Sequence, residues 1–92
     1  MSERFRRKPA VEAAPMQEET ILYDPGSKRF CLLNATAAFL WDRLAEPVTA
    51  DQLREALCGR FPGVDRAVAE QDVHKALQEF RTLAVVETVA QQ

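Results

Sequence analysis

The chain has 92 residues, of which 47% are hydrophobic, and a formal net charge of −2. This length predicts one domain with a modest core that folds without the help of a metal or a disulfide. The acid–base balance lacks the basic character of a nucleic-acid binder, and no apolar run approaches the ~20 residues that span a bilayer. The basic start Met1–Ala10 also lacks the apolar stretch of a secretory signal. We therefore expect a small acidic domain in the cytoplasm.

The first segment, residues 1–14, is charged and interrupted by proline. We expect it to be basic and partly flexible, with a short strand near Val11, and to precede a folded domain over residues 15–92. Charge runs of this kind are more typical of a solvated tail than of a docking element. The bases in it are Arg4, Arg6, Arg7 and Lys8.

A β-hairpin is predicted next. Glu19–Asp24 has the composition of a strand. Pro25-Gly26-Ser27 is turn chemistry, because proline pre-sets φ and glycine accepts a positive φ. Lys28–Leu33 then returns antiparallel, and its side chains alternate between two faces. Phe30 and Leu32 fall on one face, and Arg29, Cys31 and Leu33 fall on the other.

Two helices follow, and each begins at a capping residue. Asn34 can accept a hydrogen bond from an amide of the first helical turn. The apolar positions after it recur at i, i+3, i+4 and i+7, until Pro47 ends the helix. Thr49 and Gln52 form a capping box for the second helix, which ends near Gly59.

Asp65 is expected to cap a third and longer helix. At 100° per residue, one flank of its apolar stripe carries Val68, Asp72, Lys75 and Glu79, and the other carries Glu70, His74 and Arg81. Leu83–Val89 is either the end of this helix or a closing strand, and its Val85-Val86 pair favours the strand. The order predicts an α+β, winged helix-turn-helix-like domain, with a small antiparallel sheet of about three strands followed by three helices.

Catalytic and metal-binding chemistry is scarce in this sequence. His74 is the only histidine, so a His-rich metal site is excluded and a nucleophile–histidine pair would depend on it alone. Cys31 and Cys58 match no metal-ligand or CxxC spacing and are expected to be ordinary thiols. The three glycines do not form a phosphate-binding loop. We therefore expect no enzymatic activity, no cofactor and no metal.

A longer pattern resembles the PqqD family. It is ILYDPGSKRFCLLNATAAFLWDRL, followed by PVTADQLREAL. The recurring features are a strand that ends in a Leu-Asn step, a helix start of small residues with threonine, an aromatic–aspartate pair, and a threonine-capped second helix. Here they are Leu33-Asn34, Ala35-Thr36-Ala37, Trp41-Asp42 and Val48-Thr49. The resemblance runs from about Glu18 to about Val86, most of the chain.

The resemblance implies a non-catalytic peptide-recognition domain of the bacterial cytoplasm. Members known as RiPP recognition elements bind the leader segment of a ribosomally synthesised and post-translationally modified precursor peptide. They present it to a modifying enzyme, such as a radical SAM maturase or, in lasso-peptide pathways, a leader protease. The leader lies as an added strand on the third strand of the sheet, and its side chains enter a groove beside the third helix.

In this chain the leader would contact the strand Lys28–Leu33 and one flank of the third helix. An edge strand offers unpaired amides and carbonyls to a second chain, and the bases at its start favour an acidic leader. Small Ala76 leaves room for an anchoring side chain of the leader. The predicted peptide-binding residues are Lys28, Arg29, Phe30, Cys31, Leu32, Val68, Asp72, Val73, Lys75, Ala76 and Glu79.

Other interpretations stay open. Phe30 and Leu32 could be core residues, and the helix flank could be a solvated face. A winged-helix DNA-binding regulator would have the same fold class, although the third helix mixes bases with acids where a recognition helix needs a denser basic set. A subunit that docks on an enzyme without touching peptide has no distinguishing sequence feature. An exposed edge strand could also pair with its own copy in a homodimer.

Overall fold

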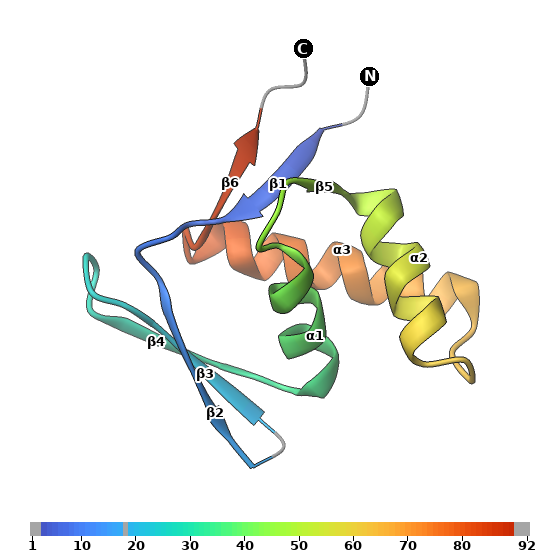
Figure 1. Cartoon of the computed structure of the whole chain (residues 1–92), viewed down its shortest axis with the longest axis horizontal. Coiled ribbons are helices and arrows are strands. Elements are labelled where there is room, and N and C mark those ends of the chain that lie inside the picture. The colour runs from blue at the N-terminus through green and yellow to red at the C-terminus, as the bar shows by residue number, and fades with distance from the viewer. Residues whose placement is uncertain (1–2, 18, 90–92) are drawn as a thin grey trace.

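The computed structural model describes residues 3–17 and 19–89 (Figure 1). In chain order the elements are β1 (Arg4–Arg7), β2 (Glu12–Met16), β3 (Glu19–Asp24), β4 (Arg29–Leu33), α1 (Ala35–Arg43), β5 (Val48–Thr49), α2 (Ala50–Arg60), α3 (Arg66–Thr82) and β6 (Val86–Val89). The α+β class is confirmed. The expected single sheet is replaced by two three-stranded antiparallel sheets, ordered β5-β1-β6 and β2-β3-β4. None of the described helices is long and apolar enough to cross a membrane.

The first sheet contains a strand that the sequence did not predict. Three of the four bases expected in a solvated tail, Arg4, Arg6 and Arg7, lie in β1, the central strand of this sheet. Its Phe5 is buried and pairs with Val48 of β5 on one side and with Thr88 of β6 on the other. The Arg6 guanidinium lies 3.1 Å from the Glu87 carboxylate, which ties β1 to β6 again. Burial of one aromatic side chain and pairing on both sides therefore hold this basic segment in the fold.

The second sheet contains the predicted hairpin. β3 and β4 pair with Leu22 opposite Cys31 and Tyr23 opposite Phe30. The strand expected near Val11 begins one residue later, as β2, and the expected boundary between residues 14 and 15 falls inside it. Because β2 lies on the far side of β3, β4 is an edge strand.

The hairpin turn differs from the prediction in one residue. Gly26 does not take a positive φ; Lys28 does, at 60°. Asp24 organises this loop, because its side chain accepts hydrogen bonds from the Gly26 amide and the Ser27 hydroxyl, and its carbonyl accepts one from the Lys28 amide at 2.7 Å. Lys28 thus belongs to the turn, and the strand begins at Arg29.

The predicted helix starts are confirmed. The side chain of Asn34 accepts from the Ala37 amide at 2.8 Å, Thr49 and Gln52 form the reciprocal capping box, and Asp65 accepts from the Ala67 amide. The predicted closing strand is confirmed as β6.

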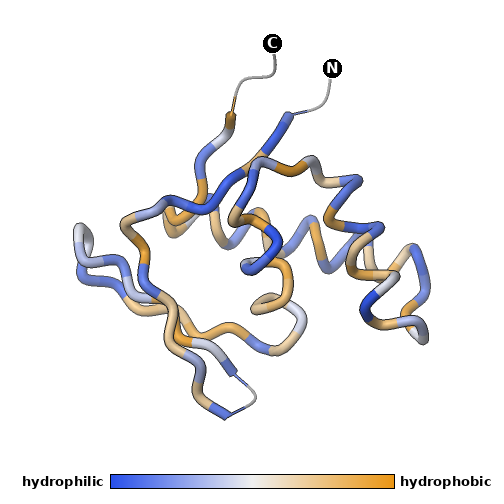
Figure 2. Tube along the Cα trace, in the orientation of Figure 1, coloured by the Kyte–Doolittle hydropathy of each residue, from blue (hydrophilic) through white to orange (hydrophobic). Residues whose placement is uncertain are grey.

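The core lies between the helices and the two sheets. Hydrophobic and hydrophilic residues alternate along the helices in Figure 2, as amphipathic helices require. The centre of the core contains an edge-to-face pair of Trp41 from α1 and Phe80 from α3, with ring centroids 5.5 Å apart. The largest fully buried side chains are Trp41, Phe80, Leu22, Leu33, Leu40, Leu44, Leu53 and Leu57. The core therefore fixes β3, β4 and α3 relative to one another.

Candidate peptide-binding site

Strand β4 has one unpaired side. In an antiparallel ladder, alternate residues of an edge strand point their N–H and C=O groups away from their neighbour, where a second chain can pair with them. The other edge of the same sheet is β2, and its Pro15 has no N–H to donate. β4 contains no proline, so it is the edge of this sheet that offers continuous pairing.

Both ends of β4 are fixed by local structure. Lys28 reverses the chain before the strand, and the Asn34 cap begins α1 directly after it. A peptide that pairs with β4 is therefore limited to five residues of ladder, and this limit restricts its register.

The two faces of β4 differ in burial. Phe30 and Leu32 are 71% and 59% exposed, so they are not core residues. Leu33, on the opposite face, is fully buried, and Cys31 is half-buried against the core. The predicted alternation is present, with an outer apolar face and an inner face toward α3.

A hollow of about 160 Å³ lies where the end of β4 meets α1 and α3. Four of the six residues predicted on α3 line it. The capped start of α1 forms its other wall. Its lining residues are Asn34, Thr36, Ala37, Asp72, Lys75, Ala76 and Glu79.

The other two residues predicted on α3 lie elsewhere. Val73 is only 2% exposed and belongs to the core, so it lies beneath the surface that a peptide would reach. Val68 is exposed, but it does not line the hollow. Of Val73 and Ala76, which were expected to form an apolar floor together, only Ala76 lines the hollow.

A second, much smaller hollow lies toward the hairpin end of β4. Its lining residues are Leu22 and Asp24 of β3, Arg29, Phe30 and Cys31 of β4, and Leu83 and Val85, which follow α3. The two hollows share no lining residue, and one lies toward each end of β4. We call the region that contains both of them, on the inner side of β4 and beside α3, the β4–α3 groove.

Cys31 lies at the middle of β4 and lines the second hollow. Burial is the main cause that raises the pKa of its thiol, and the negative charge of Glu79 raises it further. The thiol is therefore neutral at pH 7, and it presents a small, weakly polar surface to the groove. The effect of Glu79 also shows that strand and helix are close enough for their side chains to interact.

The groove carries charges that can act on a ligand. Asp72, Lys75 and Glu79 form no ion pair with any described residue. Two carboxylates and one ammonium are therefore available at one end, and the Arg29 guanidinium lies at the other. Across residues 3–17 and 19–89, no group of three or more His, Cys, Asp or Glu side chains could hold a metal ion. The charged side chains at the two ends of the groove suit polar recognition of a peptide.

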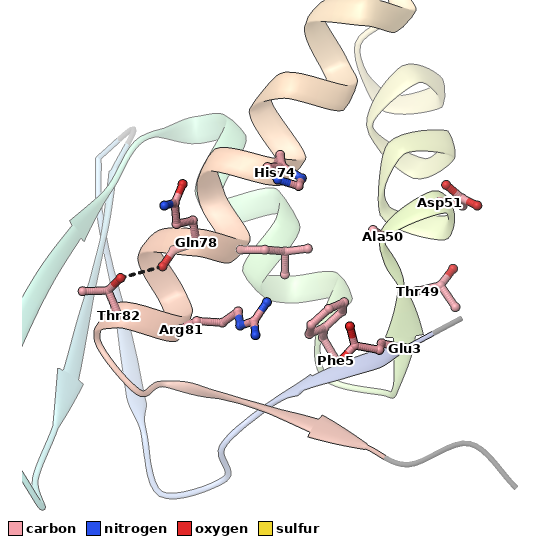
Figure 3. Close-up of a pocket in the computed structure, with 10 residues that line it drawn as sticks. Glu3, Phe5, Thr49, Ala50, Asp51, His74, Gln78, Arg81 and Thr82 are labelled. Carbon is pink, nitrogen blue, oxygen red and sulfur yellow. Dashed lines mark hydrogen bonds between the residues drawn. The ribbon is translucent and has the colours of Figure 1, made fainter. Parts of the chain in front are cut away.

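A larger hollow, of about 750 Å³, lies on the opposite flank of α3 (Figure 3). Its walls come from β1, the start of α2 and α3. Arg81 spans part of it, with its guanidinium 5.9 Å from the centre of the Phe5 ring. The hollow contains none of the predicted peptide-binding residues, and its size alone does not make it the better candidate.

Sequence reasoning missed several residues of the groove. Thr36 and Ala37 line its first hollow, and Leu83 and Val85 line its second. The first pair could have been found from the Asn34 cap, because a helix that starts at the end of an edge strand must border any groove there. No sequence signal places the second pair beside β4.

Two solved structures have a fold similar to that of this chain. The solved structure "TbiB1 in Complex with the TbiA(beta) Leader Peptide" is 23% identical and superposes with a TM-score of 0.78, covering 94% of this chain and 99% of that chain. "Lasso peptide synthetase B1 complexed with the leader peptide" is 24% identical, with a TM-score of 0.75, covering 90% of this chain and 96% of that chain. Both share the fold of this chain. No curated protein sequence matches it.

The family comparison extends over most of the chain. The model of the family described as coenzyme PQQ synthesis protein D matches residues 19–86, from the start of β3 to the start of β6. The matched segment contains β4, α1 and α3, which together form the β4–α3 groove. The chain therefore belongs to the PqqD family.

Proposed function

We propose that this protein is a non-catalytic peptide chaperone. It binds the leader of a ribosomally synthesised precursor peptide as a strand added to β4, with side chains entering the β4–α3 groove. The observation that carries the proposal is the free edge of β4 beside a hollow lined by α1 and α3. Membership of the PqqD family and two similarly folded proteins solved with leader peptides support it.

Strand addition divides recognition between backbone and side chains. Main-chain hydrogen bonds to β4 supply affinity for any extended segment, and pockets at alternate positions supply specificity. Ala76 is small, so the hollow above it accepts one anchoring side chain of the peptide. Arg29 near the hairpin end favours an acidic residue of the leader at that point.

The bound leader would then be presented to a modifying enzyme in the bacterial cytoplasm. A radical SAM maturase and a leader protease of the lasso type are the two classes that the family resemblance implies. A similarly folded protein is named as a lasso peptide synthetase B1 bound to a leader peptide, which makes a lasso-type pathway one context to test. The chain itself needs no catalytic residue, cofactor or metal for this role.

The proposal is tested by a two-dimensional amide NMR titration of the labelled protein. The ligand is the leader peptide encoded beside the gene, and the same precursor without its leader is the control. We expect shifts in residues 28–33 and along α3 from Val68 to Phe80, and no shifts with the leaderless peptide. A well-dispersed spectrum that does not change with the leader would contradict the proposal.

No observation favours the alternative of a DNA-binding regulator. The exposed bases of α3 are interspersed with acids, and Arg66 is already paired with Glu55. A recognition helix needs a denser set of positive and amide groups to offset phosphate repulsion. Salt-dependent retention of duplex DNA by the protein in a gel shift would favour the DNA-binding function over the peptide-binding one.

A further inference from the structure

Two rows of side chains run across the outer face of the sheet β2-β3-β4. One row joins Tyr23 to Phe30, whose ring centroids are 4.6 Å apart. The other joins Ile21 to Leu32. Both rows end at β4, on the side where no strand pairs with it.

The exposure of these rows is uneven. Tyr23 and Ile21 are half-buried within the sheet, whereas Phe30 and Leu32 are the most exposed of the large hydrophobic side chains among the described residues. The uncovered apolar surface thus lies at the ends of the rows, next to the free edge. A strand added to β4 would place its own side chains directly opposite Phe30 and Leu32, about 4.5–5.5 Å away between Cβ atoms.

We infer that the bound peptide carries two apolar side chains, two residues apart, which extend these rows by packing against Phe30 and Leu32, with an uncharged or basic residue between them. The inference rests on strand addition to β4, the function proposed above. It adds a recognition surface on the outer face of the sheet to the β4–α3 groove on the inner face. It also defines the class of peptide as an apolar–x–apolar segment in an extended conformation.

The nature of the middle residue follows from alternation. A residue between two outward side chains points inward, opposite Cys31 and toward the flank of α3. Asp72 and Glu79 line that side of the groove, with Lys75 between them. Of these, Glu79 is close enough to act on Cys31, so an acidic residue opposite Cys31 would meet its negative charge, whereas acidic residues of the leader are better placed at Arg29.

The test measures binding of the fluorescein-labelled synthetic leader encoded beside the gene, by fluorescence polarisation. The variants are Phe30→Ser and Leu32→Ser. The matched control is Met16→Ser, because Met16 is 55% exposed on β2, at the other edge of the same sheet. We expect each of the first two to weaken binding about fivefold and the control to leave it unchanged.

A serine scan of the peptide completes the experiment. Two positions spaced by two residues should each lose about fivefold, and the loss at one of them should shrink in the Phe30→Ser protein, as coupled contacts require. Equal binding by all proteins and peptides would overturn the inference while the chaperone function stands. Absence of leader binding by the wild-type chain would overturn both. The wild-type protein could also form a dimer that Phe30→Ser dissociates while peptide binding stays intact. That result would show that Phe30 and Leu32 contact a second copy of this chain, and it would overturn the inference.

Discussion

The end of α3 allows a stability change to be calculated from the structure. Leu83 is the C-cap, and the next residue, Ala84, has a φ of 59°. The Ala84 amide donates to the Arg81 carbonyl at 3.1 Å and the Val85 amide donates to the Phe80 carbonyl at 3.0 Å. These two bonds form a Schellman motif, in which glycine is the usual residue at the position of Ala84.

We predict that Ala84→Gly stabilises the protein. The left-handed conformation costs an L-residue about 1–2 kcal/mol, and glycine loses roughly 0.5–1 kcal/mol more conformational entropy on folding. The difference is a gain of about 0.5–1 kcal/mol in the free energy of unfolding, which raises the Tm of a domain of this size by about 2–8 °C.

Urea denaturation followed by circular dichroism measures this change. The matched control is Ala56→Gly, since Ala56 lies inside α2 with ordinary helical geometry. That control should lose about 1 kcal/mol. An Ala84→Gly protein whose free energy of unfolding is unchanged or lower, at an unchanged m value, would refute the reasoning.

Three further predictions concern the groove and the caps. Glu79→Gln removes one of the causes that raise the pKa of Cys31, so its thiolate fraction and its rate of alkylation by iodoacetamide at pH 8 should increase. Mass spectrometry of the labelled peptide measures this rate, and an unchanged rate would show that Glu79 does not act on the thiol. Bound leader should slow alkylation of Cys31 but not of Cys58, which lies on α2 outside the groove; equal protection of both would place the peptide elsewhere. Thr49→Ala should lower the free energy of unfolding by about 1 kcal/mol, because it removes the capping box, whereas Thr49→Ser should retain most of that stability. Equal losses for the two variants in urea titrations would contradict the role of the Thr49 hydroxyl as the cap.

The elements that the sequence predicted well depend on neighbours along the chain. The caps at Asn34, Thr49 and Asp65 follow from side chains that bond amides two or three residues away. The hairpin also follows from a local turn and the alternation of its strands. Such features depend on few residues, so composition and spacing are enough to predict them.

The elements that the sequence did not predict depend on contacts between distant segments. β1 is a strand because it pairs with β5, more than 40 residues later, and with β6, near the end of the chain. No pattern within Arg4–Arg7 reveals those partners. Likewise, Lys28 and Ala84 take left-handed conformations that composition assigns to glycine, because the geometry of the turn and of the helix end requires them.

The candidate site also contains some parts that could be predicted from the sequence and others that could not. The edge strand and the exposed flank of α3 followed from periodicity and family resemblance. The depth at which α3 packs could not be derived, so Val73 was expected in the groove although it lies in the core. The walls from α1 and from Leu83 and Val85 depend on how three elements meet in space.

The most direct test of the central claim is hydrogen exchange of the backbone amides with and without leader peptide. Strand addition to β4 predicts slower exchange at alternate amides of Arg29–Leu33, and unchanged exchange in β2, the other edge of the same sheet. Slowing confined to β2, or to the large hollow near Arg81, in a protein that binds the leader would contradict the account.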